Sequence, residues 1–188
     1  MDNQYYSQTL LLAEVDKDDI ILRPVERWKA HKEGILHRGF TVIMMLHGKY
    51  LLQHRKNPVF DNTWDFSFSS HPLYENNTLI SDAQAIQRSL EREWNINPNM
   101  IINDPQLLGK VYYKAKDPKS EFTEHEIDYV YSLHLKEVPA QNLEYSYGYE
   151  LIDGGPNLET RLSEYALTPW VQAIFQEISL IPIENTIK

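Results

Sequence analysis

The stretch SDAQAIQRSLEREW, Ser81–Trp94, carries the clearest helix pattern in a chain whose other patterns are mostly those of strands. Ser81 and Gln84 form a capping-box pattern at its start. Apolar residues recur at helical spacing on one face, at Ala83, Ile86 and Leu90. Asn95 follows at the position where a left-handed cap is favourable. We therefore predict one long amphipathic helix over this stretch.

Strand patterns lie on both sides of this helix. They cover 10–15 and 20–22 as a short hairpin, 39–46 and 50–55 as a second hairpin, and then 107–113, 124–135 and 147–152. Shorter helices are expected at 25–33, ended by Gly34, at 157–165, and at 169–178 with Pro169 in the first turn. The mixture predicts an α+β fold in which one long helix is embedded among strands.

The segment 124–135 shows the most regular alternation. Its apolar face holds Ile127, Tyr129, Tyr131, Leu133 and Leu135. Its other face carries three acidic residues, Glu124, Glu126 and Asp128. Because successive side chains of a strand point to opposite faces, Glu124 and Glu126 are expected to converge on one point. A solvated polar edge is the simpler interpretation of this pattern taken alone.

Composition limits the function classes. The chain has 188 residues, 42% hydrophobic and 24% charged, which is typical of one globular domain over residues 1–188. The net charge is −9 and the lysines and arginines form no dense cluster, so no nucleic-acid partner is expected. No run approaches the roughly 18 apolar residues of a membrane span, and no basic leader opens the chain. Without any cysteine, disulfides and a thiolate nucleophile are excluded, and a soluble cytoplasmic protein is expected.

Three histidines stand near these features. His31 and His37 are six residues apart in AHKEGILHRGF, and His71 ends the segment WDFSFSSHP. None of these spacings is a metal signature alone, and each histidine is more often a surface or hydrogen-bonded residue. Three imidazoles together with two carboxylates would nevertheless provide five ligands to a divalent cation. Magnesium, manganese and zinc are all compatible with that set.

Five separated motifs, in order, resemble those of type 1 isopentenyl-diphosphate isomerase, a branch of the Nudix superfamily. They are AHKEGILHRGF, the W-x6-HP of WDFSFSSHP, the capped helix ending LEREWNI, TEHEIDYVY and LTPW. The resemblance runs from about residue 15 to residue 170. It implies a Nudix fold of mixed β-sheets with the Nudix helix at Ser81–Trp94 and flanking helices.

The resemblance also implies roles for particular residues. The implied metal ligands are His31, His37, His71, Glu124 and Glu126, with Mg2+ or Mn2+ as cofactor and Zn2+ as a further option. Glu93 matches the residue that holds a second magnesium together with the substrate diphosphate. The implied catalytic residues are Glu126 as acid/base, Tyr113, and Trp170, whose ring can stabilise a carbocation. Arg27 and Arg55 fall where the family places cations for the diphosphate.

Two departures from the family pattern concern the reaction. The second proton-transfer group of these isomerases is a cysteine, and that position is Ser69 here, with no evident replacement for the thiol nearby. A serine hydroxyl transfers protons poorly at neutral pH, and one positioned acid/base group is worth roughly 10²–10⁴ in rate. Phe66 replaces an asparagine and is expected to alter the pocket wall. In the Nudix helix, Glu93 alone of the acidic signature is in register, and Ser89 replaces an arginine that often binds phosphate.

Three functions remain open. The first is an isopentenyl-diphosphate isomerase-like enzyme with Ser69 in place of the thiol. The second is a Nudix hydrolase that uses the same metal pocket to attack a diphosphate. The third is a diphosphate-binding protein without turnover. All three predict a small diphosphate as partner, and the sequence leaves the oligomeric state open.

Overall fold

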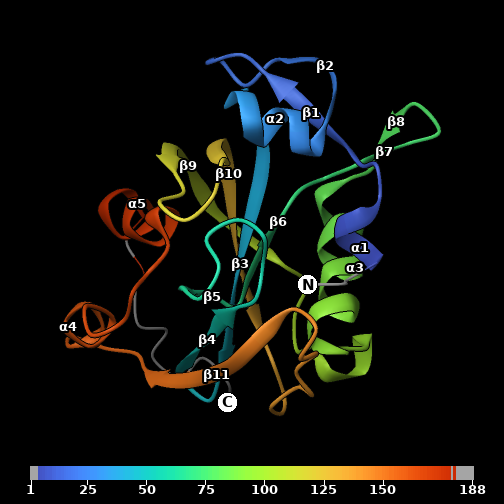
Figure 1. The fold of residues 1–188 in the computed structure, drawn as a ribbon. Coiled ribbons are helices and arrows are strands. Elements are labelled where there is room, and N and C mark those ends of the chain that lie inside the picture. Colours follow the sequence, from blue (N-terminus) through green and yellow to red (C-terminus); the bar gives the residue numbers. More distant parts are fainter. Residues whose placement is uncertain (1–3, 179, 181–188) are drawn as a thin grey trace.

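The structure is a computed structural model that describes residues 4–178 and 180. A large mixed sheet lies between helices on its two faces (Figure 1). The helices are α1 Gln4–Ser7, α2 Arg27–Glu33, α3 Asp82–Trp94, α4 Leu158–Leu162 and α5 Pro169–Glu177. The strands are β1 Leu11–Val15, β2 Ile21–Glu26, β3 His37–Leu46, β4 Lys49–Arg55, β5 Trp64–Phe66, β6 Phe68–Ser70, β7 Tyr74–Glu75, β8 Thr78–Leu79, β9 Gln106–Lys116, β10 Thr123–His134 and β11 Ser146–Asp153.

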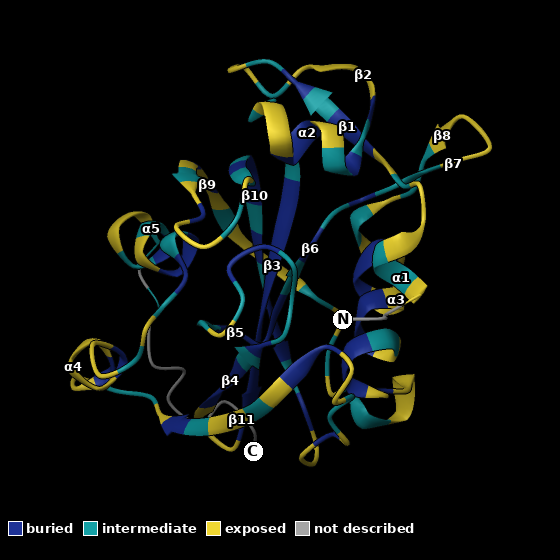
Figure 2. Cartoon of the chain, viewed as in Figure 1, coloured by how far each residue is buried: buried dark blue, intermediate teal, exposed yellow. Residues whose placement is uncertain are grey.

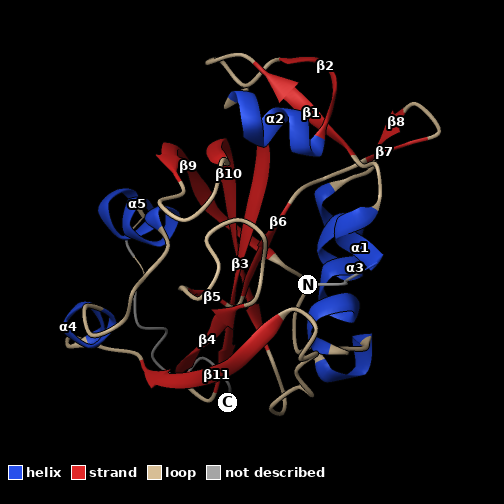
Figure 3. Cartoon of the chain, in the orientation of Figure 1, coloured by secondary structure: helices blue, strands red, loops and turns tan. Residues whose placement is uncertain are grey.

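Strand β3 is the centre of the sheet. It pairs in parallel with β10, whose other edge pairs antiparallel with β9. It also pairs antiparallel with β6 and, at its far end, with β4. The parallel register sets Glu126 opposite His37, so the carboxylates of β10 lie beside the first residue of β3. Strand pairing alone therefore brings two segments about 90 residues apart to one end of the sheet (Figure 3).

Helix α3 begins and ends as the sequence predicts. Both bonds of the capping box between Ser81 and Gln84 are present, and Asn95 adopts the left-handed conformation with φ 49°. Ile86 and Leu90 are buried as their helical spacing predicts, whereas Ala83 is exposed because the buried stripe runs through Ala85 instead. That stripe consists of Ala85, Ile86, Ser89, Leu90, Glu93 and Trp94. The helix thus presents both apolar and polar side chains to the inside.

Each face of the sheet carries its own apolar core (Figure 2). Leu133 of β10 packs in the cluster with Leu90 and Trp94 of α3. Val130, on the opposite face of β10, packs in the cluster with Trp170 and Ile174 of α5. The predicted alternation of β10 is confirmed. Its acidic residues point to the α5 side of the sheet, where they are buried and do not form a solvated edge.

Some boundaries differ from the predicted ones. Val25 belongs to β2, where it pairs with Leu12, so α2 begins only at Arg27 after the Glu26 N-cap. Gly34 ends α2 in the left-handed conformation, as predicted. The helix expected at 157–165 is reduced to α4, and strands β5 to β8 were not predicted. Among the described residues no helix is long and apolar enough to cross a membrane.

Candidate metal centre and active site

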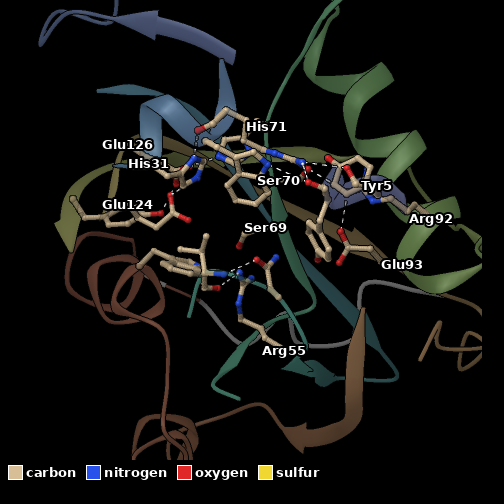
Figure 4. Close-up of a pocket in the computed structure, with 17 residues that line it drawn as sticks. Tyr5, His31, Arg55, Ser69, Ser70, His71, Arg92, Glu93, Glu124 and Glu126 are labelled. Atoms are coloured by element: carbon tan, nitrogen blue, oxygen red, sulfur yellow. Dashed lines mark hydrogen bonds and ion pairs between the residues drawn. The ribbon is translucent and has the colours of Figure 1, made fainter. Parts of the chain in front are cut away.

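A pocket opens beside the paired ends of β3 and β10, below α2. Figure 4 shows His31, Glu124 and Glu126 on one side of it and Arg92 and Glu93 on the other. Ser69 and Arg55 lie between these groups in the same view. The pocket is lined by residues from α1, α2, α3, α5 and four strands, so it forms only when the whole chain is folded.

Two buried histidines are oriented by backbone carbonyls. The Nδ1 of His31 lies 2.6 Å from the carbonyl oxygen of Arg27, and the Nδ1 of His37 lies 2.8 Å from that of Ile35. A carbonyl oxygen only accepts hydrogen bonds, so in both rings Nδ1 carries the proton and donates it. In the neutral imidazoles the lone pair is therefore on Nε2, the tautomer that a metal ligand requires.

The ligand atoms of His31, His37, His71 and Glu124 all lie within 4.8 Å of one another. The Oε2 of Glu124 is buried and accepts no hydrogen bond, although it lies 3.2 Å from the Nε2 of His31. An orphaned carboxylate oxygen is costly in a protein interior unless it meets a cation. This donor set of three imidazoles and one carboxylate fits a divalent metal ion.

Glu126 lies against this group but is not one of its four members. Its Oε1 is 2.7 Å from the Nε2 of His71 and 3.3 Å from that of His37. Its Oε2 accepts a short hydrogen bond from the hydroxyl of Tyr113. The carboxylate lies against the backbone of Gly39, where a Cβ atom would approach Glu126 Oε1 to 2.6 Å. Only glycine leaves room for the Glu126 carboxylate at this point of β3.

Neighbouring charges set the protonation of these groups. Burial alone would raise the pKa of Glu126, but the nearby imidazoles of His37 and His71 hold it well below its usual range. Burial lowers the pKa of His31, yet the Glu124 carboxylate outweighs burial and raises that pKa to about 9. Burial and the nearby charge of Glu126 raise the pKa of Asp128 well above its usual value. The surroundings thus favour the ionised form of Glu126 and the protonated form of Asp128.

A second buried carboxyl, Asp65, lies behind Ser69. Ser69 Oγ donates to Asp65 Oδ2 at 3.0 Å, and Trp170 Nε1 donates to Oδ1 at 2.8 Å. Arg55 Nη1 also donates to Oδ2 at 2.8 Å. Burial raises the pKa of Asp65 to about 6, against the lowering by Arg55. One carboxyl therefore fixes three side chains that line the pocket.

A chain of hydroxyl groups continues from Ser69. Its Oγ lies 2.8 Å from Thr41 Oγ1, which is 2.8 Å from Asp128 Oδ2. Phe66, expected in the pocket wall, is fully buried in the core and does not line the pocket, so that expectation is wrong. Its strand neighbour Asp65 and not Phe66 shapes the surroundings of Ser69.

The two arginines expected to bind the diphosphate line the pocket but have partners within the protein. Arg27 Nη2 donates to the carbonyl oxygens of Tyr5, Tyr6 and Gln8. The guanidinium of Arg55 lies 4.9 Å from the ring centroid of Trp170, besides its contact with Asp65. The cation over this aromatic ring is thus an arginine of the chain itself.

Glu93 lines the same pocket, away from the four-residue metal group. It accepts from Arg92 Nη2 at 2.8 Å and from Gln53 Nε2 at 3.3 Å. Arg92 also donates to Ser89 Oγ at 3.0 Å, and its guanidinium stacks on Tyr5. A guanidinium is therefore present beside Ser89, supplied from the next turn of α3.

Sequence reasoning missed Asp65, Thr41 and Arg92. Asp65 and Ser69 are an even number of positions apart in WDFSFSSHP, which indicates a shared strand face. Ser89 and Arg92 are three apart in α3, which places them on one helix face. For Thr41 no such local signal exists, because its partners come from β6 and β10.

No family model matches the chain. Proteins similar to it in sequence include two that are named as isopentenyl-diphosphate isomerases. The isopentenyl-diphosphate Delta-isomerase of Serratia proteamaculans is 29% identical over 124 residues, 64% of this chain and 64% of the relative. The isopentenyl-diphosphate delta-isomerase of Candida albicans is 29% identical over 173 residues, 79% of this chain and 57% of the relative. The matches therefore span less than two thirds of the length of these relatives.

Solved structures identify the fold. A protein from Deinococcus radiodurans superimposes with a TM-score of 0.63 at 15% identity, covering 88% of this chain and 97% of that one. The NUDIX domain of Shewanella oneidensis NrtR, solved with ADP ribose, gives a TM-score of 0.51 at 14% identity, covering 94% and 96%. The predicted α+β Nudix fold is confirmed, and so is the predicted resemblance to enzymes named isopentenyl-diphosphate isomerase.

Proposed function

We propose that this chain, which has the Nudix fold and resembles isopentenyl-diphosphate isomerases in sequence, is a divalent-metal-dependent isomerase acting on an isoprenoid or related diphosphate. One observation carries the proposal. It is the convergence of His31, His37, His71 and Glu124 within 4.8 Å, at the rim of a pocket that also holds Glu126 and Trp170.

The proposed metal ligands are His31, His37, His71, Glu124 and Glu126, for Mg2+ or Mn2+, with Zn2+ compatible with the same donors. A bound ion would supply positive charge for anionic oxygens of the substrate. Glu93 is the proposed holder of a second magnesium with the diphosphate. Its position in the pocket, away from the first group, supports a separate role.

The remaining side chains have separate proposed roles in moving the double bond. Glu126 is the acid/base on one side of the substrate, and Tyr113 holds it in place through a hydrogen bond to Oε2. Ser69 is the second proton-transfer group, in the position of the family's cysteine. The ring of Trp170 would stabilise positive charge on carbon. Arg27 and Arg55 are the proposed cations for the diphosphate, since both line the pocket.

The proposal includes a single domain, a cytoplasmic location and a small-molecule diphosphate as the partner. A Nudix hydrolase is the alternative with structural support, because the same metal group could activate water. Against it, Glu93 is the one residue of the acidic hydrolase signature that is in register in α3, and a hydrolase commonly needs more of those carboxylates to hold its metals. A diphosphate-binding protein without turnover is the third outcome.

The test is to incubate the purified protein with Mg2+ or Mn2+ and isopentenyl diphosphate, and separately with nucleoside and other isoprenoid diphosphates. Dimethylallyl diphosphate is the expected product. Release of phosphate or pyrophosphate would instead establish the hydrolase, and binding without product would establish the third function. The matched variants are His31→Asn, which should abolish activity, and His47→Asn at an exposed turn, which should preserve it.

A further inference from the structure

Asp65 is a carboxyl that has no assigned role in the proposed reaction. It is completely buried on β5 and does not itself line the pocket. The three side chains that donate to it, Arg55, Ser69 and Trp170, all line the pocket. Asp65 is therefore one hydrogen bond removed from the pocket, and Ser69 is the only one of these three links whose donor is a hydroxyl.

The Ser69 hydroxyl is the hydrogen-bonded link that can both give and take a proton. The guanidinium of Arg55 stays protonated at any working pH, and an indole N–H is a donor only. A hydroxyl can release its proton to one neighbour while it accepts another. The 3.0 Å contact between Ser69 Oγ and Asp65 Oδ2 is thus a path by which a proton can move between the pocket and a buried carboxyl.

The charged groups around Asp65 favour a carboxyl that works near neutral pH. Arg55 is the cation in contact with it, and the carboxyl of Asp128 interacts with it at longer range. Burial outweighs the lowering by Arg55 and brings the pKa of Asp65 to about 6. Asp65 is therefore mainly ionised at pH 7, ready to accept a proton, and is protonated at only slightly lower pH.

We propose that Asp65 is the proton partner of Ser69, so that a Ser69–Asp65 pair performs the transfer for which the resembling isomerases use a thiol. This inference rests on the proposed isomerase function. It replaces the expectation that nothing near Ser69 stands in for the thiol. Asp65 acts through Ser69 as a positioning residue and does not touch the substrate.

Proton removal follows protonation of the original double bond from the other side of the pocket. A C–H bond next to the resulting cationic carbon breaks, and its electron pair fills the empty orbital of that carbon to form the new carbon–carbon double bond. The released proton bonds to Ser69 Oγ while the proton already on Ser69 moves to Asp65 Oδ2. Ser69 ends as a hydroxyl and Asp65 ends as a neutral carboxyl. Asp65 then returns the proton through Ser69 to water in the pocket after the product leaves, or to substrate carbon in the reverse reaction.

The kinetic test compares Asp65→Asn in two backgrounds of the metal-loaded protein. With Ser69 present, kcat should fall roughly 10²–10⁴-fold with KM little changed, because a positioned acid/base group is lost. In a Ser69→Ala background, Asp65→Asn should lower the residual kcat by less than about threefold, since additivity fails for residues that act as one unit. Equal losses in both backgrounds would show a merely structural role and overturn the inference.

The pH dependence of kcat/KM is a second test of the Ser69–Asp65 pair. The kcat/KM of the natural protein should fall as pH drops through about 6, because protonated Asp65 no longer accepts a proton. This acidic limb should be absent from the residual activity of Asp65→Asn. A Ser69→Cys variant should regain activity in the Asp65→Asn background, since a thiol with a pKa of about 8.5 transfers protons without such a partner. Persistence of the limb in Asp65→Asn would contradict the proposal.

A measurement without turnover separates this inference from the proposed function. Side-chain carboxyl signals of 13C-labelled aspartate are titrated by NMR in the metal-loaded protein, and the Asp65 signal is the one lost in Asp65→Asn. Ser69→Ala removes a hydrogen bond to the carboxylate and should raise the Asp65 midpoint. An unchanged midpoint overturns the pairing even if isomerase activity is present. A raised midpoint in a protein that turns over no diphosphate contradicts the proposed function alone.

Discussion

The metal end of the pocket, around His31, His37 and Glu124, differs in construction from the proton-transfer end, around Asp65 and Ser69. At the metal end, rings fixed by backbone carbonyls present lone pairs to one point. At the other end a single carboxyl, tied to a fixed positive charge, holds the side chains that line the pocket. The first end carries every ligand that the family resemblance implies, whereas at the second Ser69 stands where the resembling family has a thiol. The proposed metal ligands and the proposed proton-transfer pair thus have separate direct contacts, and Thr41 and Asp128 lie between them.

The largest expected effect is a loss of folding stability when the ion pair at the proton-transfer end is broken. Arg55→Met leaves the fully buried Asp65 without its cation, and breaking a buried ion pair on one side costs about 3–5 kcal/mol. The free energy of unfolding, measured in urea on the metal-free protein, should fall by that amount. Arg23→Met removes an ion pair of the same type at an exposed position and should leave stability unchanged.

The same variant tests independence. If the two ends are separate, folded Arg55→Met should bind Mn2+ as tightly as the natural protein, measured by calorimetry. A large loss of metal affinity would show that Arg55 supports the metal end as well, and the two-part description would then be wrong.

The second effect belongs to the metal end. Glu124→Gln replaces the orphaned carboxylate oxygen by an uncharged amide, so affinity for Mn2+ should fall more than about 100-fold, the upper range for losing even an outer partner of a ligand. Glu91→Gln, on the exposed side of α3, is the matched control and should bind normally. Unaltered affinity in Glu124→Gln would remove this residue from the metal site.

The metal end was predictable from sequence, whereas at the other end Ser69 was predicted and its partner Asp65 was missed. The alternation of β10 places Glu124 and Glu126 on one face from sequence alone, and motif order connects them to the histidines. The parallel pairing of β10 with β3, which brings them beside His37, has no local signal. The role of Asp65 depends on β4, β6 and α5 meeting around it, and short strands such as β5 carry too little periodicity to be read.

The fold shows the same division. The sequence predicts helix α3 with its caps because capping chemistry is local, whereas the core decides which residues of the helix are buried, and Ala85 is buried there instead of Ala83. Val25 was assigned to a helix because its pairing with Leu12 of β1 cannot be seen in the helix pattern. Local rules predict elements and their ends, and tertiary packing decides which face and which partner.

A smaller effect is expected at the point where the backbone of β3 meets Glu126. Gly39→Ala places a Cβ atom 2.6 to 2.7 Å from the Glu126 carboxylate, and overpacking of this kind costs about 1–3 kcal/mol. The melting temperature should fall, together with the Mn2+ affinity. Gly148→Ala, where the new Cβ meets nothing within 4 Å, should change neither. Loss of stability with intact metal affinity would place Glu126 outside the metal end.

A pH dependence is expected at the metal end alone. The pKa of His31 is raised to about 9 in the metal-free protein, since the Glu124 carboxylate outweighs burial, so a proton competes with the metal for Nε2. Mn2+ affinity should therefore fall as pH drops from about 9 to 7, by up to about tenfold per unit for one displaced proton.

The stability of the metal-free protein should change in the opposite sense and rise as pH drops. A folded-state pKa above the unfolded value of about 6.5 contributes stability that is complete below 6.5 and is lost as pH rises through about 9. Melting curves in chelator across this range measure the stability, and calorimetry measures the affinity. Both slopes should be unchanged in Asp65→Asn, because its carboxyl has no contact with His31. A change in either slope in that variant would show that the two ends of the pocket are coupled.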